Sequence, residues 1–197
     1  AITGNAVFGN EDSDTATGLA TLAVTGTTNI NTTAVASSGT QVYGDAAGTD
    51  TITLGANTTL TGSTVTFNAP IIAAAHALNV HGNAVFGDST GDDTATGLAT
   101  LAVTGTTNIN ASAVSSTGTQ IYGDATGTDT ITLGANTTMT GSTVTFNAPI
   151  AAAAHALAVT GNAVFGDSTG DDTATGLSSL SVSGTANINT TAITSTG

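Results

Sequence analysis

The chain repeats itself at an interval of 79 residues, and this repeat limits the folds open to it. Residues 43–71 recur as residues 122–150 with only two substitutions between the copies. The sequence Val-Phe-Gly that starts at Val7 starts again at Val85 and at Val164. Near-identical units at a fixed period fold as a stack, in which each unit buries its core against its neighbours.

The composition excludes several classes of partner. Among its 197 residues the chain has no Lys, no Arg and no Cys, and its net charge is −13. Without cationic side chains it cannot neutralise phosphates, so we expect no nucleic-acid partner and no binding to anionic membranes. The lack of Cys excludes disulfides and thiolate metal sites, and no apolar run is long enough for membrane insertion. Because the chain offers no trypsin sites, we expect an extracellular or cell-surface location.

Strand signals dominate the whole chain. Short alternating runs rich in Val, Ile, Thr and aromatic residues are separated by Gly, Asn and Asp, as is typical of short strands joined by turns. No amphipathic segment carries a credible helix cap. The sequence therefore predicts an all-β protein.

A shorter pattern inside the unit predicts how the strands are wound. An apolar-x-apolar pair is followed six residues later by a large apolar residue, and successive pairs are 30, 26 and 23 residues apart. The pairs are Leu22/Val24, Ile52/Leu54, Leu78/Val80, Leu101/Val103, Ile131/Leu133, Leu157/Val159 and Leu180/Val182. Interpreting each step as one coil predicts a β-solenoid, a right-handed parallel β-helix with about three coils per 79-residue repeat. Four coils of about 20 residues also fit the pattern.

We expect residues 1–197 to form one continuous β-solenoid. Its repeat units are approximately 1–77, 78–156 and a partial unit, 157–197. The chain begins and ends inside a unit, so we expect it to be a window from a longer array.

The acidic residues are the main candidates for chemistry, because all 13 lie in five turns. The candidate metal ligands are Asp12, Asp14, Asp45, Asp50, Asp88, Asp92, Asp93, Asp124, Asp129, Asp167, Asp171 and Asp172. In the three-coil register these turns stack in pairs about one strand spacing apart, where two carboxylates repel by roughly 1 kcal/mol in water. Ca²⁺ would offset this repulsion and prefers such oxygen ligands. The alternative is that each Asp only caps its turn and keeps the surface soluble.

Other polar motifs have simpler interpretations. His76, His81 and His155 are expected to be structural, and the T-x-T triplets recur too irregularly to predict ice binding. Five Asn-x-Ser/Thr sequons could carry glycans, although a Thr- and Asn-rich chain contains such sequons by chance. The seven aromatic residues recur in register and are expected to stack in the core. Nothing groups a nucleophile with a base, so we expect no enzyme activity.

Two resemblances extend this interpretation. The segment Gly-Thr-Asp-Thr-Ile-Thr at residues 127–132 resembles the second half of the Ca²⁺-binding nonapeptide of RTX proteins. The segments at residues 22–35 and 51–70 resemble the repeats of filamentous-haemagglutinin-type surface proteins, which are long bacterial β-helices. That resemblance implies an extracellular structural filament, joined end to end through self-association or continuation of the same chain. The alternative is an adhesin stalk or module that binds a glycan or another cell surface.

Overall fold

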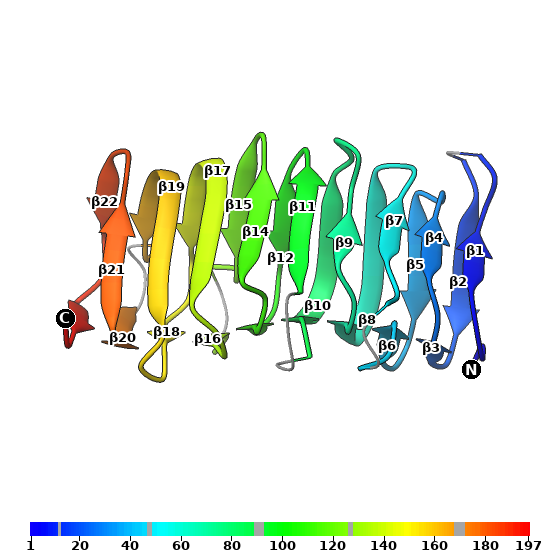
Figure 1. Cartoon of the computed structure of the whole chain (residues 1–197), viewed down its shortest axis with the longest axis horizontal. Coiled ribbons are helices and arrows are strands. Elements are labelled where there is room, and N and C mark those ends of the chain that lie inside the picture. Colours follow the sequence, from blue (N-terminus) through cyan, green and yellow to red (C-terminus); the bar gives the residue numbers. More distant parts are fainter. Residues whose placement is uncertain (12, 47–48, 89–92, 126–127, 168–171) are drawn as a thin grey trace.

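The computed structural model of the chain describes residues 1–11, 13–46, 49–88, 93–125, 128–167 and 172–197. The described residues form 23 strands in one sheet system, with no helix among them. The strands lie side by side across the long axis, and the two termini lie at opposite ends (Figure 1). This arrangement confirms the predicted all-β solenoid. In the described part of the chain, nothing has the helical length and hydropathy that crossing a membrane would require.

The coil is triangular, and each turn contributes one strand, or half of a long strand, to each of three faces. Face 1 consists of β1 (Ala6–Phe8), β4 (Thr28–Ile30), β7 (Ile52–Leu54), β9 (Ile71–Ile72), β11 (Thr94–Leu98), β14 (Ala113–Ser116), the first halves of β17 (Thr137–Phe146) and β19 (Ala156–Phe165), and β21 (Ser179–Val182). Face 2 consists of β2 (Thr15–Leu19), β5 (Ala34–Ser37), the first halves of β8 (Thr58–Phe67) and β10 (Leu78–Phe86), β12 (Leu101–Val103), β15 (Thr119–Tyr122), the second halves of β17 and β19, and β22 (Ala186–Ile188). Face 3 consists of β3 (Leu22–Val24), β6 (Gln41–Tyr43), the second halves of β8 and β10, β13 (Thr107–Ile109), β16 (Ile131–Leu133), β18 (Ile150–Ala151), β20 (Thr173–Leu177) and β23 (Ala192–Ser195).

The strand pairing sets the length of each coil. All pairings are parallel, and paired residues are between 18 and 25 positions apart in the sequence. The predicted steps of 30 and 26 residues are therefore not coils. Leu22 pairs with Gln41 rather than with Ile52, and Ile52 pairs with Ile71. Only the 23-residue step closes one turn, as when Leu78 pairs with Leu101.

One 79-residue unit does not make a whole number of turns. From β6 to the equivalent β15 the chain passes nine strands, two of which, β8 and β10, bend and serve two faces each. The unit therefore has eleven sides, which is three full turns and two further sides. The number of coils per unit therefore falls between the three coils that were predicted and the four-coil division that the sequence left open. Each unit consequently places its features on a different face from the unit before it.

The core is a continuous apolar column inside the triangle. Along each short strand, inward residues are buried and outward residues are partly exposed, as in Ile52–Leu54, where both apolar side chains are fully buried. Two columns of rings run through it. Tyr43, Phe67 and Phe86 stack with ring centroids 5.9 and 5.2 Å apart, and their equivalents Tyr122, Phe146 and Phe165 repeat both distances. These contacts confirm that the stacked rings belong to the core.

A buried polar pair interrupts the apolar column in each full unit. The hydroxyl of Tyr43 donates a hydrogen bond to Gln41 Oε1 at 2.7 Å, and Gln41 Nε2 donates to the carbonyl oxygens of Val35 and Thr61. Both side chains of the pair are fully buried. The same pair recurs as Tyr122 and Gln120. Burial raises the pKa of both tyrosines well above the usual value near 10.

Candidate functional site

The acidic turns form corners of the triangle, and every acidic residue that the structure describes lies outside the strands. The five corners fall within residues 9–14, 44–50, 87–93, 123–129 and 166–172, and the strands that flank each of them lie on two adjacent faces. Corners 44–50 and 87–93 lie on the edge between faces 3 and 1. Corners 123–129 and 166–172 are the equivalents of these two corners one unit later. They lie on the edge between faces 2 and 3, because eleven sides are two sides more than three full turns.

Two acidic corners on one edge do not stack directly on each other. An Asn-Ala-Pro corner lies between them, as the pairing of Phe67 with both Tyr43 and Phe86 requires. The amide of Asn68 donates to the Tyr43 carbonyl, and the amide of Gly87 donates to the Phe67 carbonyl, each at 2.8 Å. The acidic corners are thus two coils, or about 10 Å, apart. The predicted stacking at one strand spacing is wrong, because it depended on the incorrect coil steps.

The last Asp of three corners closes its own turn. Asp93 Oδ2 accepts a hydrogen bond from the amide of Asp88 at 3.0 Å, and Asp172 Oδ2 accepts one from the amide of Asp167 at 3.1 Å. In the shorter first corner, Asp14 Oδ2 accepts from the amide of Asn10 at 2.9 Å. A short carboxylate side chain is well suited to this type of turn.

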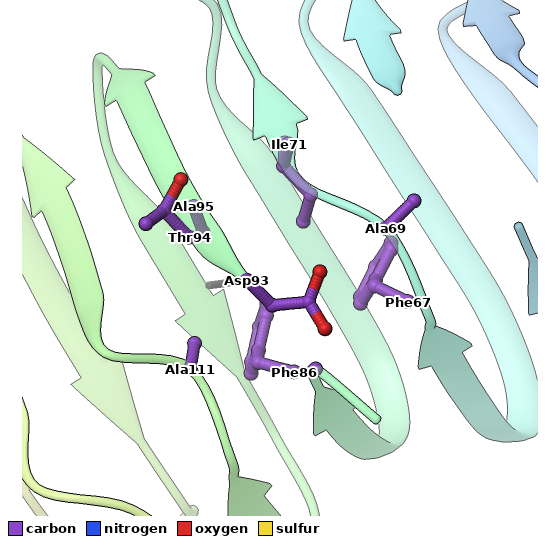
Figure 2. Close-up of a pocket in the computed structure, with 9 residues that line it drawn as sticks. Phe67, Ala69, Ile71, Phe86, Asp93, Thr94, Ala95 and Ala111 are labelled. Atoms are coloured by element: carbon purple, nitrogen blue, oxygen red, sulfur yellow. The ribbon is translucent and has the colours of Figure 1, made fainter. Parts of the chain in front are cut away.

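Figure 2 shows how the turn-closing Asp meets the core. Asp93 lies beside Phe86 at a small hollow whose wall also includes Phe67, Ala69 and Ile71. The hollow has no space for a water-sized molecule. Asp172, the equivalent of Asp93 in the next unit, is only 6% exposed. This carboxylate is therefore held at the rim of the core by backbone amides and does not face an open cavity.

The described carboxylates do not gather into a cation cage. Asp50 and Asp129 begin the return to the next strand and are half-buried, whereas Asp124 is exposed and Asp45 is half-buried. Asp12, Asp92 and Asp171, three of the predicted ligands, lie outside the described residues. Among the residues that the structure does describe, no group of three His, Cys, Asp or Glu side chains could hold a metal ion. The arrangement that is described fits turn closure better than six- to eight-fold oxygen coordination.

Asn side chains at other corners clamp successive coils together, a role that sequence reasoning missed. Asn31 Nδ2 donates to the carbonyl of Gly9 at 3.2 Å, and Asn110 Nδ2 donates to the carbonyl of Gly87 at 3.0 Å. Asn57 Oδ1 accepts from the amide of Ala77 in the next coil at 2.8 Å. All of these Asn residues belong to sequons. The recurrence of Asn at two places in the unit, Asn31 with Asn110 and Asn57 with Asn136, was the available signal.

His76 and His155 end a strained turn that carries no acidic residue. The amide of His76 donates to the carbonyl of Ala73 at 2.8 Å, and the two residues between them, Ala74 and Ala75, have φ values of 47° and 68°. Positive φ at two successive non-glycine residues is unusual. The same geometry recurs at residues 152–155.

A comparison of the chain with protein-family models, with curated proteins and with solved structures gives no match.

Proposed function

We propose that the chain is a segment of an extracellular structural filament in which β-solenoid repeats are joined end to end. The observation that carries this proposal is that an internal coil pairs in parallel with a coil of the same kind on both sides, as β10 does with β8 on one side and with β12 and β13 on the other. Ile188 is 59% exposed, whereas its equivalent in the preceding unit, Ile109, is fully buried. A further coil of the same kind would bury such a side chain and pair the open strands.

The near-identity of the units supports the same proposal. The upper side of one coil must fit the lower side of the next coil along the axis. The chain repeats the same pairings, β10–β12 and β19–β21, one unit apart. The partner is therefore the same kind of repeat, either a second copy or a continuation of the chain. The resemblance to filamentous-haemagglutinin-type repeats supports a cell-surface location, and the uniform outer surface supports a structural role over an enzymatic one.

We also propose Ca²⁺ as a stabilising ion at the acidic corners. With a net charge of −13 and no Lys or Arg, the chain has no cationic side chain to offset repulsion along an edge. The described carboxylates that such an ion would use are those of Asp88 and Asp93 in one corner and of Asp167 and Asp172 in another. Simple turn closure by Asp is the competing explanation.

The second candidate function is an adhesin stalk that presents a glycan-binding or cell-binding surface. An exposed patch that varies from unit to unit would favour it. Most outward residues of equivalent strands are the same, and the exceptions include Asn79 and His81 of β10, which are Ala158 and Thr160 in β19. Val85 and Val164, by contrast, occupy the same outward place in β10 and β19.

Electron microscopy of the purified chain at increasing concentration tests the filament proposal. We expect thin, unbranched threads, and aligned threads should give a meridional diffraction spacing near 4.8 Å. Compact particles of constant size at every concentration would contradict end-to-end joining. A mutated end coil with Ile188→Asp is the matched control, and it should shorten or abolish the threads.

A further inference from the structure

The five Asn-x-Ser/Thr sequons fall into two structural classes. An N-linked glycan is attached to the side-chain nitrogen of the Asn, Nδ2, and the hydroxyl two residues later is the other group that defines the acceptor. Whether these two groups are free therefore decides whether a sequon can receive a sugar in the folded solenoid. The sequons begin at Asn31, Asn57, Asn110, Asn136 and Asn189.

In the first class, both groups hold the preceding coil. Asn110 Nδ2 donates to the carbonyl of Gly87 at 3.0 Å, and Ser112 Oγ donates to the carbonyl of Asp93 at 3.3 Å. The Asn110 side chain is half-buried. The equivalent pairs of bonds recur at Asn31 with Thr33 and at Asn189 with Thr191. A sugar could reach these Asn residues only after the bond between the coils had opened.

In the second class, the Asn uses its oxygen instead of its nitrogen. Asn57 Oδ1 accepts a hydrogen bond from the amide of Ala77 in the following coil at 2.8 Å, and the side chain is exposed. In the part of the chain that the structure describes, no atom accepts a hydrogen bond from Asn57 Nδ2 or from the hydroxyl of Thr59. The side chain is thus held in place through Oδ1 while Nδ2 keeps both of its donors.

The next unit repeats this second arrangement. Asn136 Oδ1 accepts from the amide of Ala156 at 2.9 Å, and the Asn136 side chain is again exposed. Among the described residues, nothing accepts a hydrogen bond from Asn136 Nδ2 or from the hydroxyl of Thr138. The two free sequons therefore occupy equivalent places one unit apart.

The middle residue of each free sequon anchors it to the core. Thr58 and Thr137 are 1% and 2% exposed, and their hydroxyls donate to the carbonyls of Thr32 and Ala111 in the preceding coil. Because side chains alternate along an extended chain, the residues on either side of each buried Thr lie on the outward side together. The acceptor nitrogen and the hydroxyl that defines the sequon are thus presented to the same side.

We infer that Asn57 and Asn136 are N-glycan acceptor sites of the folded solenoid, and that the three clamping Asn residues are not. The donor is a sugar activated as a diphosphate ester. The bond between its anomeric carbon and the phosphate oxygen breaks, and a bond from that carbon to Nδ2 forms. One proton leaves Nδ2 for a base of the transferase, and the diphosphate departs with the bonding electrons.

The geometry of the repeat sets where the sugars lie. Asn57 lies on the edge between faces 1 and 2, and Asn136 lies on the edge between faces 3 and 1. Eleven sides are three and two-thirds coils, which at the strand spacing is a rise of about 18 Å. The corners before and after Asn57 on its edge, residues 31–33 and 73–77, contain no acidic residue. The sugars therefore follow a helical path around the solenoid.

Transfer of hexose to the folded chain tests this inference. The purified chain is incubated with a nucleoside-diphosphate hexose and a soluble N-glycosyltransferase that recognises Asn-x-Ser/Thr. Cleavage before Asp then places each sequon on its own peptide for mass spectrometry. We expect hexose at Asn57 and Asn136 to appear at least about tenfold faster than at Asn31 or Asn110, where local opening must come first. In peptides cleaved before the reaction, this difference should disappear.

Thr59→Ala is the matched control, because it removes the hydroxyl and keeps the bond between Asn57 and Ala77. It should abolish transfer at Asn57 and leave both the melting temperature and transfer at Asn136 unchanged. Absence of hexose at Asn57 and Asn136 in the folded chain would overturn the inference, and so would equal rates at Asn31 and Asn110. The result is independent of the filament proposal, since selective transfer supports the sites even where the chain forms no threads.

Discussion

Tyr43 and Tyr122 hold the same place in two successive repeat units, but they lie on different faces of the solenoid. Tyr43 pairs with Phe67 on face 3, whereas Tyr122 pairs with Phe146 on face 2. The stacking of the ring is nevertheless the same, with a stacked partner at 5.9 Å in both units. A unit of eleven sides thus rotates its features by one face at each repeat, and they return to the same face only after three units.

The buried Gln41–Tyr43 pair should behave as a single energetic unit. Gln41→Leu leaves the Tyr43 hydroxyl and two carbonyl oxygens without their present partner, so we expect it to lower the free energy of unfolding by about 2–4 kcal/mol. Adding Tyr43→Phe should cost much less than it does in the wild-type chain, because no phenol is then left unpaired. Urea unfolding of the four proteins measures this coupling. Strictly additive effects would contradict it, and Gln120→Leu should reproduce the first result.

The two tyrosines should make the fold sensitive to alkali. Burial holds the pKa of both phenols above the usual value, while in the unfolded chain they ionise near pH 10. Their contribution to stability is therefore complete below pH 10 and declines as the pH rises towards the folded-state pKa. Absorbance of tyrosinate at 295 nm should appear only together with loss of the β circular dichroism signal. Ionisation near pH 10 in a fully folded chain would refute this expectation, and the Tyr43→Phe/Tyr122→Phe variant should show a flatter alkaline limb.

The Ala74–Ala75 turn should be improved by residues that tolerate positive φ. Both alanines lie in the left-handed region, which costs roughly 1–2 kcal/mol per residue. Ala74→Asn with Ala75→Gly gives the sequence preferred in such turns, and we expect its melting temperature to rise. Ala73→Gly is the matched control, because Ala73 is buried and its φ is not positive; it should lower the melting temperature. A fall in both variants would contradict the strain argument.

Gly82 and its equivalent Gly4 separate backbone strain from contact between coils. Both have positive φ, 130° and 102°. A Cβ on Gly82 would overlap the carbonyl oxygen of Gly62 in the coil below, whereas a Cβ on Gly4 would meet nothing within 4 Å. We expect Gly82→Ala to destabilise by several kcal/mol and Gly4→Ala by only about 1 kcal/mol. Similar losses in thermal unfolding would show that coil contact is not the constraint.

Chelation tests the proposed role of Ca²⁺. If the ion bridges the acidic corners, removing it with EGTA should lower the melting temperature, and Ca²⁺ but not Na⁺ of equal ionic strength should restore it. Asp93→Asn keeps an oxygen that accepts the Asp88 amide but removes the charge. That variant should lose the Ca²⁺ response. An EGTA-insensitive melt, with Asp93→Asn as stable as the wild type, would leave turn closure as the whole role of this Asp.

The solenoid and its core could be predicted from the sequence, because Leu, Val, Ile and Phe recur at inward positions whatever the face. The coil length could not, because an apolar-x-apolar strand looks the same on all three faces. The 30- and 26-residue steps span four sides and the 23-residue step spans three. Two further features explain why the fourth side in each of the longer steps was not predicted. Gln41 stands at an inward position where the pattern expects an apolar residue, and β8 turns a corner at Gly62 without a break in its strand signal.

The acidic site was only half predictable for the same reason. The location of the acids in turns followed directly from their Gly-rich flanks, but their vertical spacing depended on the coil length. The closure of the turn by Asp93 depends on one particular carboxylate oxygen reaching one amide, and several Asp residues in the motif could have filled that role.

Confining the described acids to the corners leaves the three flat faces electrically neutral, with residues such as Thr53, Thr66 and Ala102 directed outward. In dilute buffer the charged corners repel those of neighbouring molecules over tens of ångströms, but at 1 M salt the screening length falls to about 3 Å. We therefore expect high ionic strength to favour side-by-side association, because it removes the repulsion between the charged corners and leaves the neutral faces free to meet.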